Sequence, residues 1–232
     1  MKSEKVNYVV ASCFRNDIRD FMEMNHYSGN INGVISDYCF CMLDDNGDIV
    51  GAAIFGRMAM ANQWRRFGEN QSDVIELRRL ACSPDAVRNS ESYMIGKMIK
   101  WLRKNTSIKV IVSYADAEYG HSGIIYKASN FRYEGFRKGA KVIVFEGKRY
   151  HDKTIRTKYN GALKPYAQKI KDALLDGRAE YRTTAGKHCY VFSLVALSHG
   201  RQYIGCELNE EYGSLQEERI SKEINKQFAD ML

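Results

Sequence analysis

The feature that most constrains the fold is a short apolar run, Ile108–Ala115, which reads Ile-Lys-Val-Ile-Val-Ser-Tyr-Ala. Such a run is typical of a strand buried on both faces, because a half-exposed strand alternates apolar and polar residues. Upstream of it, Asn89 or Ser90 can cap a helix that continues to about Lys104. This helix carries a broad apolar stripe made of Met94, Ile95, Met98, Ile99, Trp101 and Leu102. The combination predicts an α/β fold in which helices cover a central sheet.

The first 147 residues contain an ordered series of strand and helix patterns. Further strands are predicted over Asn7–Cys13, Asp37–Leu43, Ile49–Phe55 and Asp73–Cys82, and short helices over Asp17–Asn25 and Ser122–Ser129. Asn46-Gly47 is a strong hairpin signal between two of these strands. Phe131–Phe136 and Lys141–Phe145 are predicted to form a closing hairpin. The order predicts one mixed sheet with helices on its faces.

Past Gly147 the pattern loosens, and the chain is predicted to divide into three parts. We expect residues 1–147 to form the main α/β domain, 148–195 a basic, tyrosine-rich extension, and 196–232 a strand–helix tail. Helices are predicted over Leu163–Asp176 and Asn209–Asp230, and strands over Gly186–Leu197 and Gln202–Cys206.

Positive charge is concentrated in the middle of the chain. Residues 141–190 hold 12 lysines and arginines against five acidic residues, whereas residues 191–232 have a net charge of −3. Tyrosines are interleaved with this charge at Tyr150, Tyr159, Tyr166, Tyr181 and Tyr190. The combination suits the phosphates and bases of a nucleic acid. A solvated basic surface is the alternative interpretation.

Composition also bears on location and on the thiols. The sequence has no run of about 18 apolar residues that could span a membrane, and its first residues lack the apolar core of a secretory signal. We therefore expect a protein that stays in the cytoplasm where it is made, with no membrane partner. Six scattered cysteines without a CxxC pair favour free thiols over a zinc site.

The order of elements resembles the GNAT (N-acetyltransferase) fold. The segment from Tyr114 to Phe131 resembles the fifth strand of that fold and the helix that follows it. The resemblance implies acyltransferase chemistry, in which a tyrosine at the position of Tyr126 protonates the departing thiolate of coenzyme A.

Four stretches resemble one branch more closely, the phage Mom family of DNA-modifying proteins. They are Asn25–Ser28, Glu76–Leu80, Ser113–Asp116 with Gly120–Tyr126, and Gly186–Val191. The resemblance implies a transferase that adds a carbamoylmethyl group to the exocyclic N6 of adenine in phage DNA and so protects it from host restriction enzymes. Its partner would be double-stranded DNA with a flipped adenine, because a base inside a duplex cannot reach catalytic side chains.

Two stretches depart from these patterns. The turn at Arg88–Tyr93 has no glycine and carries Glu91, although a coenzyme A diphosphate is usually cradled by bare backbone amides. The donor is therefore left open between an acyl-coenzyme A-like molecule and another group, and Arg88, Ser90 and Asn130 are the cofactor-binding candidates. The tail around Glu207 resembles a fragment of amino-group DNA methyltransferases. Without their Asp-Pro-Pro-Tyr motif we expect it to serve packing or homodimer formation.

Two catalytic candidates lie in the third of the Mom-like blocks. Asp116 ends the central strand, where open α/β sheets place their ligands. It could accept the N6 proton or hold the base, and the alternative is a cap for the next turn. Tyr126 could act as a general acid or a stacking surface, and the alternative is a core tyrosine with a satisfied hydroxyl.

Two further candidates lie in the other blocks. Arg78 and Arg79 should point to opposite faces of their strand. The resemblance favours Arg79 as the ligand of a carboxylate, carbonyl or phosphate and leaves Arg78 as a plain surface charge. The reverse assignment is the alternative. His26 could be a base, a metal ligand or a DNA contact, and the alternative is an exposed loop histidine. The substrate-binding candidates are Tyr27, Ser28, Tyr114 and His121.

No metal site is assigned, because the sequence lacks a two-histidine, one-carboxylate spacing. Iron is still left open, since His26, Asp116 and His121 could converge in space. Two other functions are also left open. One is an acyl-coenzyme A-dependent N-acyltransferase for a protein or small amine, and the other is a non-catalytic DNA-binding protein with a GNAT-like core.

Overall fold

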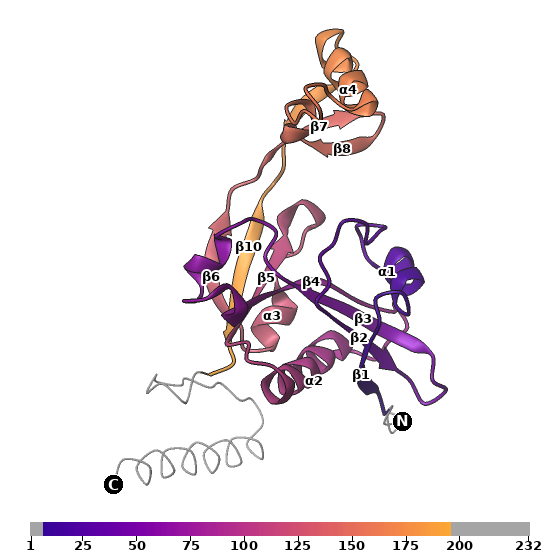
Figure 1. Ribbon diagram of the computed structural model, residues 1–232. Helices are drawn as coiled ribbons and strands as arrows, with labels where there is room; N and C mark the ends of the chain where they lie inside the picture. Colours follow the sequence, from indigo (N-terminus) through magenta and orange to yellow (C-terminus); the bar gives the residue numbers. More distant parts are fainter. Residues whose placement is uncertain (1–6, 196–232) are drawn as a thin grey trace. The chain divides into compact units, whose positions relative to one another are not determined.

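A computed structural model describes residues 7–195, which form two compact units (Figure 1). Within the described residues, the first unit contains residues 7–113, Ile125–Arg132 and residues 191–195. The second unit contains Tyr114–Ile124 and Tyr133–Tyr190. Strands β5 (Val110–Asp116) and β10 (Lys187–Ser193) each have residues in both units.

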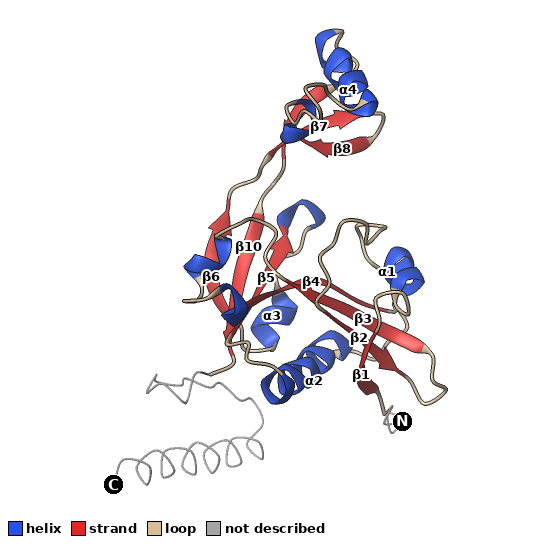
Figure 2. Cartoon of the chain, in the orientation of Figure 1, coloured by secondary structure: helices blue, strands red, loops and turns tan. Residues whose placement is uncertain are grey.

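The main sheet is mixed and mostly antiparallel, with helices against it (Figure 2). Its strand order is β1-β2-β3-β4-β5-β10-β6. Besides β5 and β10, its strands are β1 (Val9–Cys13), β2 (Tyr38–Leu43), β3 (Ile49–Gly56), β4 (Val74–Cys82) and β6 (Arg132–Arg137). The associated helices are α1 (Arg19–Asn25), α2 (Ser90–Asn105) and α3 (Ile124–Ala128), with 3-10 turns η1 (Gln63–Arg66), η2 (Gln71–Asp73) and η3 (Ala117–Tyr119).

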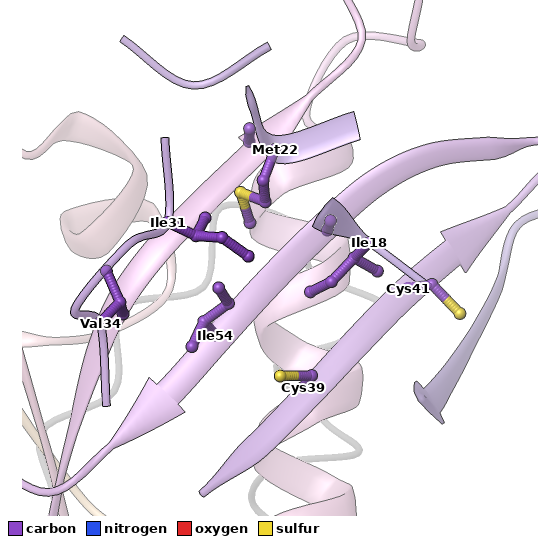
Figure 3. Close-up of a cluster of buried hydrophobic side chains, with 9 residues drawn as sticks. Ile18, Met22, Ile31, Val34, Cys39, Cys41 and Ile54 are labelled. Atoms are coloured by element: carbon purple, nitrogen blue, oxygen red, sulfur yellow. The ribbon is translucent and has the colours of Figure 1, made fainter. Parts of the chain in front are cut away.

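One face of the first unit's sheet is buried under α1 and the segment that follows it. Figure 3 shows Cys39, Cys41 and Ile54 of the sheet facing Ile18, Met22, Ile31 and Val34. The Arg15 guanidinium holds this segment in place, because it donates to the Val34 carbonyl at 2.9 Å and also to the Ile31 carbonyl. The α1 side of the sheet is therefore a closed apolar layer.

The opposite face packs against α2. Phe40 lies between Cys39 and Cys41 in β2 and so points to the other side. Its ring contacts the rings of Phe55 at 5.8 Å and Trp101 of α2 at 5.2 Å between centroids. The predicted apolar stripe of α2 is confirmed, since Met94, Met98 and Leu102 are fully buried. Asn89 occupies the N-cap position in a left-handed conformation (φ 71°), but its side chain makes no cap hydrogen bond.

Strand β4 is irregular at its centre. Ile54 lies opposite Arg79 and Phe55 opposite Leu77, so Arg78 is the extra residue of a β-bulge. On its other edge β4 pairs with β5 in parallel only from Val74–Val110 to Leu77–Ser113, although both strands continue. The bulge and the end of this pairing coincide at Arg78.

The second unit contains a smaller sheet in the order β8-β7-β9. Its elements are β7 (Lys141–Phe145), β8 (Lys148–His151), β9 (Glu180–Thr183), α4 (Pro165–Leu175) and the 3-10 turn η4 (Asp152–Ile155). They enclose a separate apolar core of Ile143, Phe145, Ile170, Ala173 and Ala179. We call residues 138–186 the insert, because they lie between β6 and β10, which are neighbours in the main sheet. A backbone bond from the Thr184 N–H to the Ala140 carbonyl (3.0 Å) joins the two ends of the insert.

The expected series of strands and helices is observed as far as β6, but the predicted closing hairpin is wrong. β7 pairs with β8 and β9, and the neighbour of β6 is β10. The predicted domain boundary at Gly147 falls in the β7–β8 turn, where Glu146 and Gly147 both have positive φ. The helix predicted over Leu163–Asp176 is α4, and the strand predicted from Gly186 is β10.

Some predictions concern residues the structure does not describe. The Gln202–Cys206 strand and the Asn209–Asp230 helix lie outside residues 7–195. Cys206 does too, whereas the other five cysteines are free thiols. No helix within the described range is long and apolar enough to cross a membrane.

The α1-side core makes a stability prediction. Ile54 is 0% exposed, so Ile54→Ala should lower the free energy of unfolding by about 2–5 kcal/mol through lost burial and a residual cavity. Ile124→Ala is the matched control, because Ile124 is 73% exposed and its loss should change stability by less than about 0.5 kcal/mol. Denaturant unfolding followed by circular dichroism measures both. Equal losses in the two variants would contradict this placement of the core.

Candidate functional site

Arg79 lies on the α1 side of the sheet, directly after the bulge. Its neighbours on that face are Ile54 across the strand pair and Ala81 two residues on, both part of the buried core. Arg78 packs elsewhere, with its guanidinium 3.2 Å from the Glu76 carboxylate and 3.0 Å from the Arg57 carbonyl. The prediction that Arg78 is a plain surface charge is therefore wrong, because its side chain is mostly buried in this ion pair.

The Arg79 guanidinium is only partly satisfied. One terminal nitrogen donates to the Arg78 carbonyl at 2.7 Å, but the buried Nε has no hydrogen-bond partner within residues 7–195. Burial lowers the pKa of the Arg79 guanidinium below its usual value, and nearby Tyr27 and Glu76 oppose that shift. A buried donor without an acceptor costs about 1–3 kcal/mol. An anionic or carbonyl oxygen placed here would remove that penalty.

The segment after α1 forms a tight polar turn. His26 is 7% exposed, and its Nδ1 accepts the Ser28 amide N–H at 3.1 Å, with the Ser28 hydroxyl 2.8 Å away. A nitrogen that accepts an amide is unprotonated, so this geometry fits neutral His26 with its proton on Nε2. The Tyr27 ring stacks at 4.2 Å from the His26 ring and is partly exposed. His26 is thus a buried, oriented side chain and not an exposed loop histidine.

These residues form one group, which we call the Arg79 cluster: His26, Tyr27, Ser28 and Arg79. Tyr27 links the turn to Arg79, because it lies close enough to oppose the lowering of the Arg79 pKa. The cluster combines a buried cation, an oriented imidazole and an exposed aromatic ring. Such a group can hold an oxygen of a substrate and stack on a planar one.

The start of α2 does not fit the diphosphate of a coenzyme A donor. Ser90 is buried and its hydroxyl donates to the Val87 carbonyl, so it points inward. Glu91 adds an acidic side chain to the first turn, and Arg88 is exposed just before it. A diphosphate needs bare amides and positive charge at a helix start. The assignment of Arg88 and Ser90 to a cofactor stays a prediction.

Tyr126 and Asn130 have local structural contacts. Tyr126 is 8% exposed and its ring packs 5.6 Å from that of Phe131, whose amide donates to the Tyr126 carbonyl. Asn130 is exposed and ends the α3 segment with φ 60°. Burial matches the alternative of a core tyrosine, and the general-acid role of Tyr126 stays a prediction.

Asp116 has two partners in the second unit. One carboxylate oxygen accepts the Glu118 amide at 3.1 Å and caps η3, and the other lies 3.2 Å from the Lys187 ammonium. The geometry therefore shows the expected alternative of a capping aspartate, and the same carboxylate also pairs with Lys187. His121 donates its amide to the Asp116 carbonyl and its side chain is exposed. Tyr114 hydrogen-bonds the buried Cys189 thiol, whose pKa is raised mainly by burial.

Sequence reasoning missed the residue that organises this region, Glu118. Its carboxylate accepts the Ala185 amide at 3.0 Å and pairs with Arg149 at 3.4 Å and with Arg182. These partners belong to the insert and are far away in sequence. The one available signal is its position two residues after Asp116.

A metal centre finds no support in the geometry of the described residues. Between residues 7 and 195 no three His, Cys, Asp or Glu side chains form a group that could hold a metal ion. His26 belongs to the first unit, and Asp116 and His121 to the second.

The chain is similar to solved acetyltransferases of low sequence identity. One is a GNAT family acetyltransferase from Elizabethkingia anophelis with acetyl-CoA bound, which has a TM-score of 0.49, is 10% identical, and is matched over 81% of this chain and 98% of that one. Another is the spermidine/spermine N-acetyltransferase of Vibrio cholerae, with a TM-score of 0.46, 9% identity, and coverage of 84% and 97%.

Sequence comparison is more specific. The chain is 28% identical over 156 residues to the methylcarbamoylase Mom of Escherichia phage Mu, a match that covers 66% of this chain and 63% of the relative. It thus spans less than two thirds of that relative's length. The model of the Mom protein family matches residues 7–205. Because this match covers most of the sequence, including the Arg79 cluster and Asp116, the chain belongs to the Mom protein family.

Proposed function

We propose that this protein is a DNA-modifying transferase that adds a carbamoylmethyl-type group to N6 of adenine in phage DNA and thereby protects the DNA from host restriction. The observation that carries the proposal is the Mom family match over residues 7–205, together with the name methylcarbamoylase of the phage Mu relative. The buried Arg79 guanidinium supports it, because its Nε has no hydrogen-bond partner among residues 7–195 and the carbonyl oxygen of a transferred group is a suitable acceptor.

The roles of the side chains follow from the chemistry of adenine N6. Its lone pair is delocalised into the ring, so the amine needs a base as the new N–C bond forms and the bond from carbon to the donor breaks. Asp116 is the proposed acceptor of the N6 proton, because its carboxylate ends the central strand. Arg79 is proposed to hold the oxygen of the incoming group, and neutral His26 to orient it.

The insert is proposed to hold the DNA backbone. The second unit has 14 lysines and arginines against eight acidic residues, which is +6 of the chain's net +7. Several arginines there are used internally, such as Arg178 with Asp176 and Arg156 with Asp152. Lys141 and Lys164 instead lie over the exposed rings of Tyr181 and Tyr159 at 3.8 and 4.2 Å. These lysines are suited to phosphates, and the target adenine must flip out of the duplex.

The main test is mass spectrometry of nucleosides from plasmid DNA of cells that express the protein. We expect a deoxyadenosine heavier by one carbamoylmethyl group with the unmutated chain, and none with Asp116→Ala or Asp116→Asn. Asp116→Asn is the sharper variant, because an amide oxygen can still accept the Glu118 amide and keep the η3 cap. Normal modification of the DNA by the Asp116→Asn variant would exclude Asp116 as the proton acceptor and leave it only the role of capping η3. Unmodified DNA from well-folded unmutated protein would overturn the proposed function.

Arg79 can be separated from its neighbour. Arg79→Lys should lower the yield of modified adenosine by roughly 10- to 100-fold, because lysine cannot present the planar set of donors and a charge-assisted hydrogen bond contributes about 1.5–3 kcal/mol. Arg78→Lys is the control, since a lysine there can still reach Glu76. The same nucleoside assay measures both. Equal losses of modified adenosine in the two variants would show that Arg79 supports the structure of β4 and does not bind the transferred group.

The insert lysines should govern the salt dependence of DNA binding. Lys158 of the insert is exposed as well. Changing Lys141, Lys158 and Lys164 to glutamine together should reduce the slope of log affinity against log salt by about 1 for each phosphate that a lysine no longer neutralises. Lys169→Gln is the control, because Lys169 is already paired with Glu146 at 2.8 Å. Fluorescence anisotropy with labelled duplex DNA at several salt concentrations measures the slopes. An unchanged slope in the triple variant would exclude these lysines as phosphate ligands.

A further inference from the structure

Three aromatic side chains from β6 and β10 form a surface that the roles above do not use. We call it the ring surface: Tyr133, Phe136 and His188. The His188 ring lies 5.8 Å from the Tyr133 ring and 5.0 Å from the Phe136 ring, and the Tyr133 hydroxyl is 3.1 Å from His188 Nδ1. Tyr133 and Phe136 are each 47% exposed. Large neighbouring rings that stay this exposed are not core residues and indicate a binding surface.

The backbone brings the rings together. Tyr133 and Phe136 are three residues apart and would point to opposite faces of a regular strand. Gly135 between them has φ 96°, which breaks the alternation and lets both rings reach His188. Gly186, also at positive φ, accommodates the Phe136 ring, since a Cβ there would come within 2.7 Å of it and 2.5 Å of the Arg137 carbonyl. The arrangement therefore depends on local backbone geometry and is not a chance gathering of side chains.

The buried side chain of Tyr190 packs against the ring surface. Tyr190 is almost fully buried, its ring lies 5.3 Å from that of Tyr133, and its hydroxyl donates to the Ser122 carbonyl at 2.5 Å. Gly123 leaves room for it, because a Cβ at that position would collide with the Tyr190 ring. The exposed rings thus rest on a fixed base, which reduces the conformational entropy lost when a planar ligand binds.

Charge identifies the class of ligand. The unit that holds the ring surface carries +6 of the chain's net +7. A partner that is polyanionic and also presents flat aromatic faces is a nucleic acid with unstacked bases. Stacking accepts any base, since every base has a π face, and so it needs no hydrogen-bonding groups beyond the rings.

We infer that Tyr133, Phe136 and His188 stack an unpaired base of the DNA substrate, an inference that rests on the proposed function. His188 follows Lys187 in β10 and points to the other face of that strand, whereas Lys187 pairs with Asp116. The stacked base is therefore not the adenine proposed to react at Asp116 but another base of the opened strand. The ring surface contributes to binding the DNA and not to the chemical step.

The test uses the full chain and single-stranded DNA oligonucleotides in which 2-aminopurine replaces one adenine, at a different position in each. Stacking on a protein ring quenches 2-aminopurine fluorescence. We expect quenching with the unmutated protein at one position or more. With the double variant Tyr133→Leu, Phe136→Leu we expect loss of that quenching and about tenfold weaker binding. Leucines keep apolar volume, and Tyr133→Phe, which keeps the ring, should behave as the unmutated protein.

The controls separate this inference from the proposed function. Unchanged thermal unfolding would show that the double variant is folded, and the single variants Tyr133→Leu and Phe136→Leu supply the comparison if it is not. Two results would overturn the inference that the ring surface stacks a base. One is quenching that persists in a folded double variant, and the other is no quenching with the unmutated protein. Nucleoside analysis reports on the transferase independently. Quenching without any modified deoxyadenosine would support base stacking on the ring surface and contradict the proposed transferase reaction.

Discussion

The pairing of β10 with β5 is the interaction on which the rest of the structure depends. The two strands run antiparallel. The Leu194 amide donates a hydrogen bond to the Lys109 carbonyl at 2.7 Å, and the Ala117 amide donates one to the Gly186 carbonyl at 3.1 Å. Residues 138–186 separate the end of β6 from the start of β10, yet β10 lies between β6 and β5 in the sheet. The entropy lost in closing so long a loop grows only slowly with its length. The insert also has its own apolar core, so the main sheet does not have to stabilise it.

Most elements of the fold could be predicted from the sequence, and the exception has a physical cause. Regular patterns such as the apolar run at Ile108–Ala115 and the stripe of α2 depend on local burial, and both predictions are confirmed. The partner of β6 could not be predicted in this way, because successive strands usually pair and β7 follows β6 directly. Lys141–Phe145 has the pattern of a strand whichever sheet it joins. Local sequence thus predicted the strand but not its neighbours.

The candidate site residues also fall into those that local sequence could indicate and those that depend on distant contacts. Arg79 and Asp116 were found because they lie in short blocks with a family resemblance or at the end of a buried strand. The bulge at Arg78 could not be predicted, because regular alternation along β4 already places Arg78 and Arg79 on opposite faces and gives no sign of an extra residue. Glu118 and His188 could not be found in this way, because their partners are tens of residues away in the sequence. Glu118 pairs with Arg149 and Arg182. The His188 ring packs against Tyr133 and Phe136. Such contacts exist only once β10 has returned beside β6.

The way the insert joins the main sheet has a consequence for how such proteins can diversify. Its two ends are bonded to each other at Ala140 and Thr184, and its core is separate from that of the sheet. Changes in sequence between these ends need not alter the register of the strands that carry Arg79 and Asp116, provided that the contacts of Glu118 with Ala185, Arg149 and Arg182 are kept. The insert is therefore a segment with its own core, whose sequence can diversify while the main sheet stays unchanged.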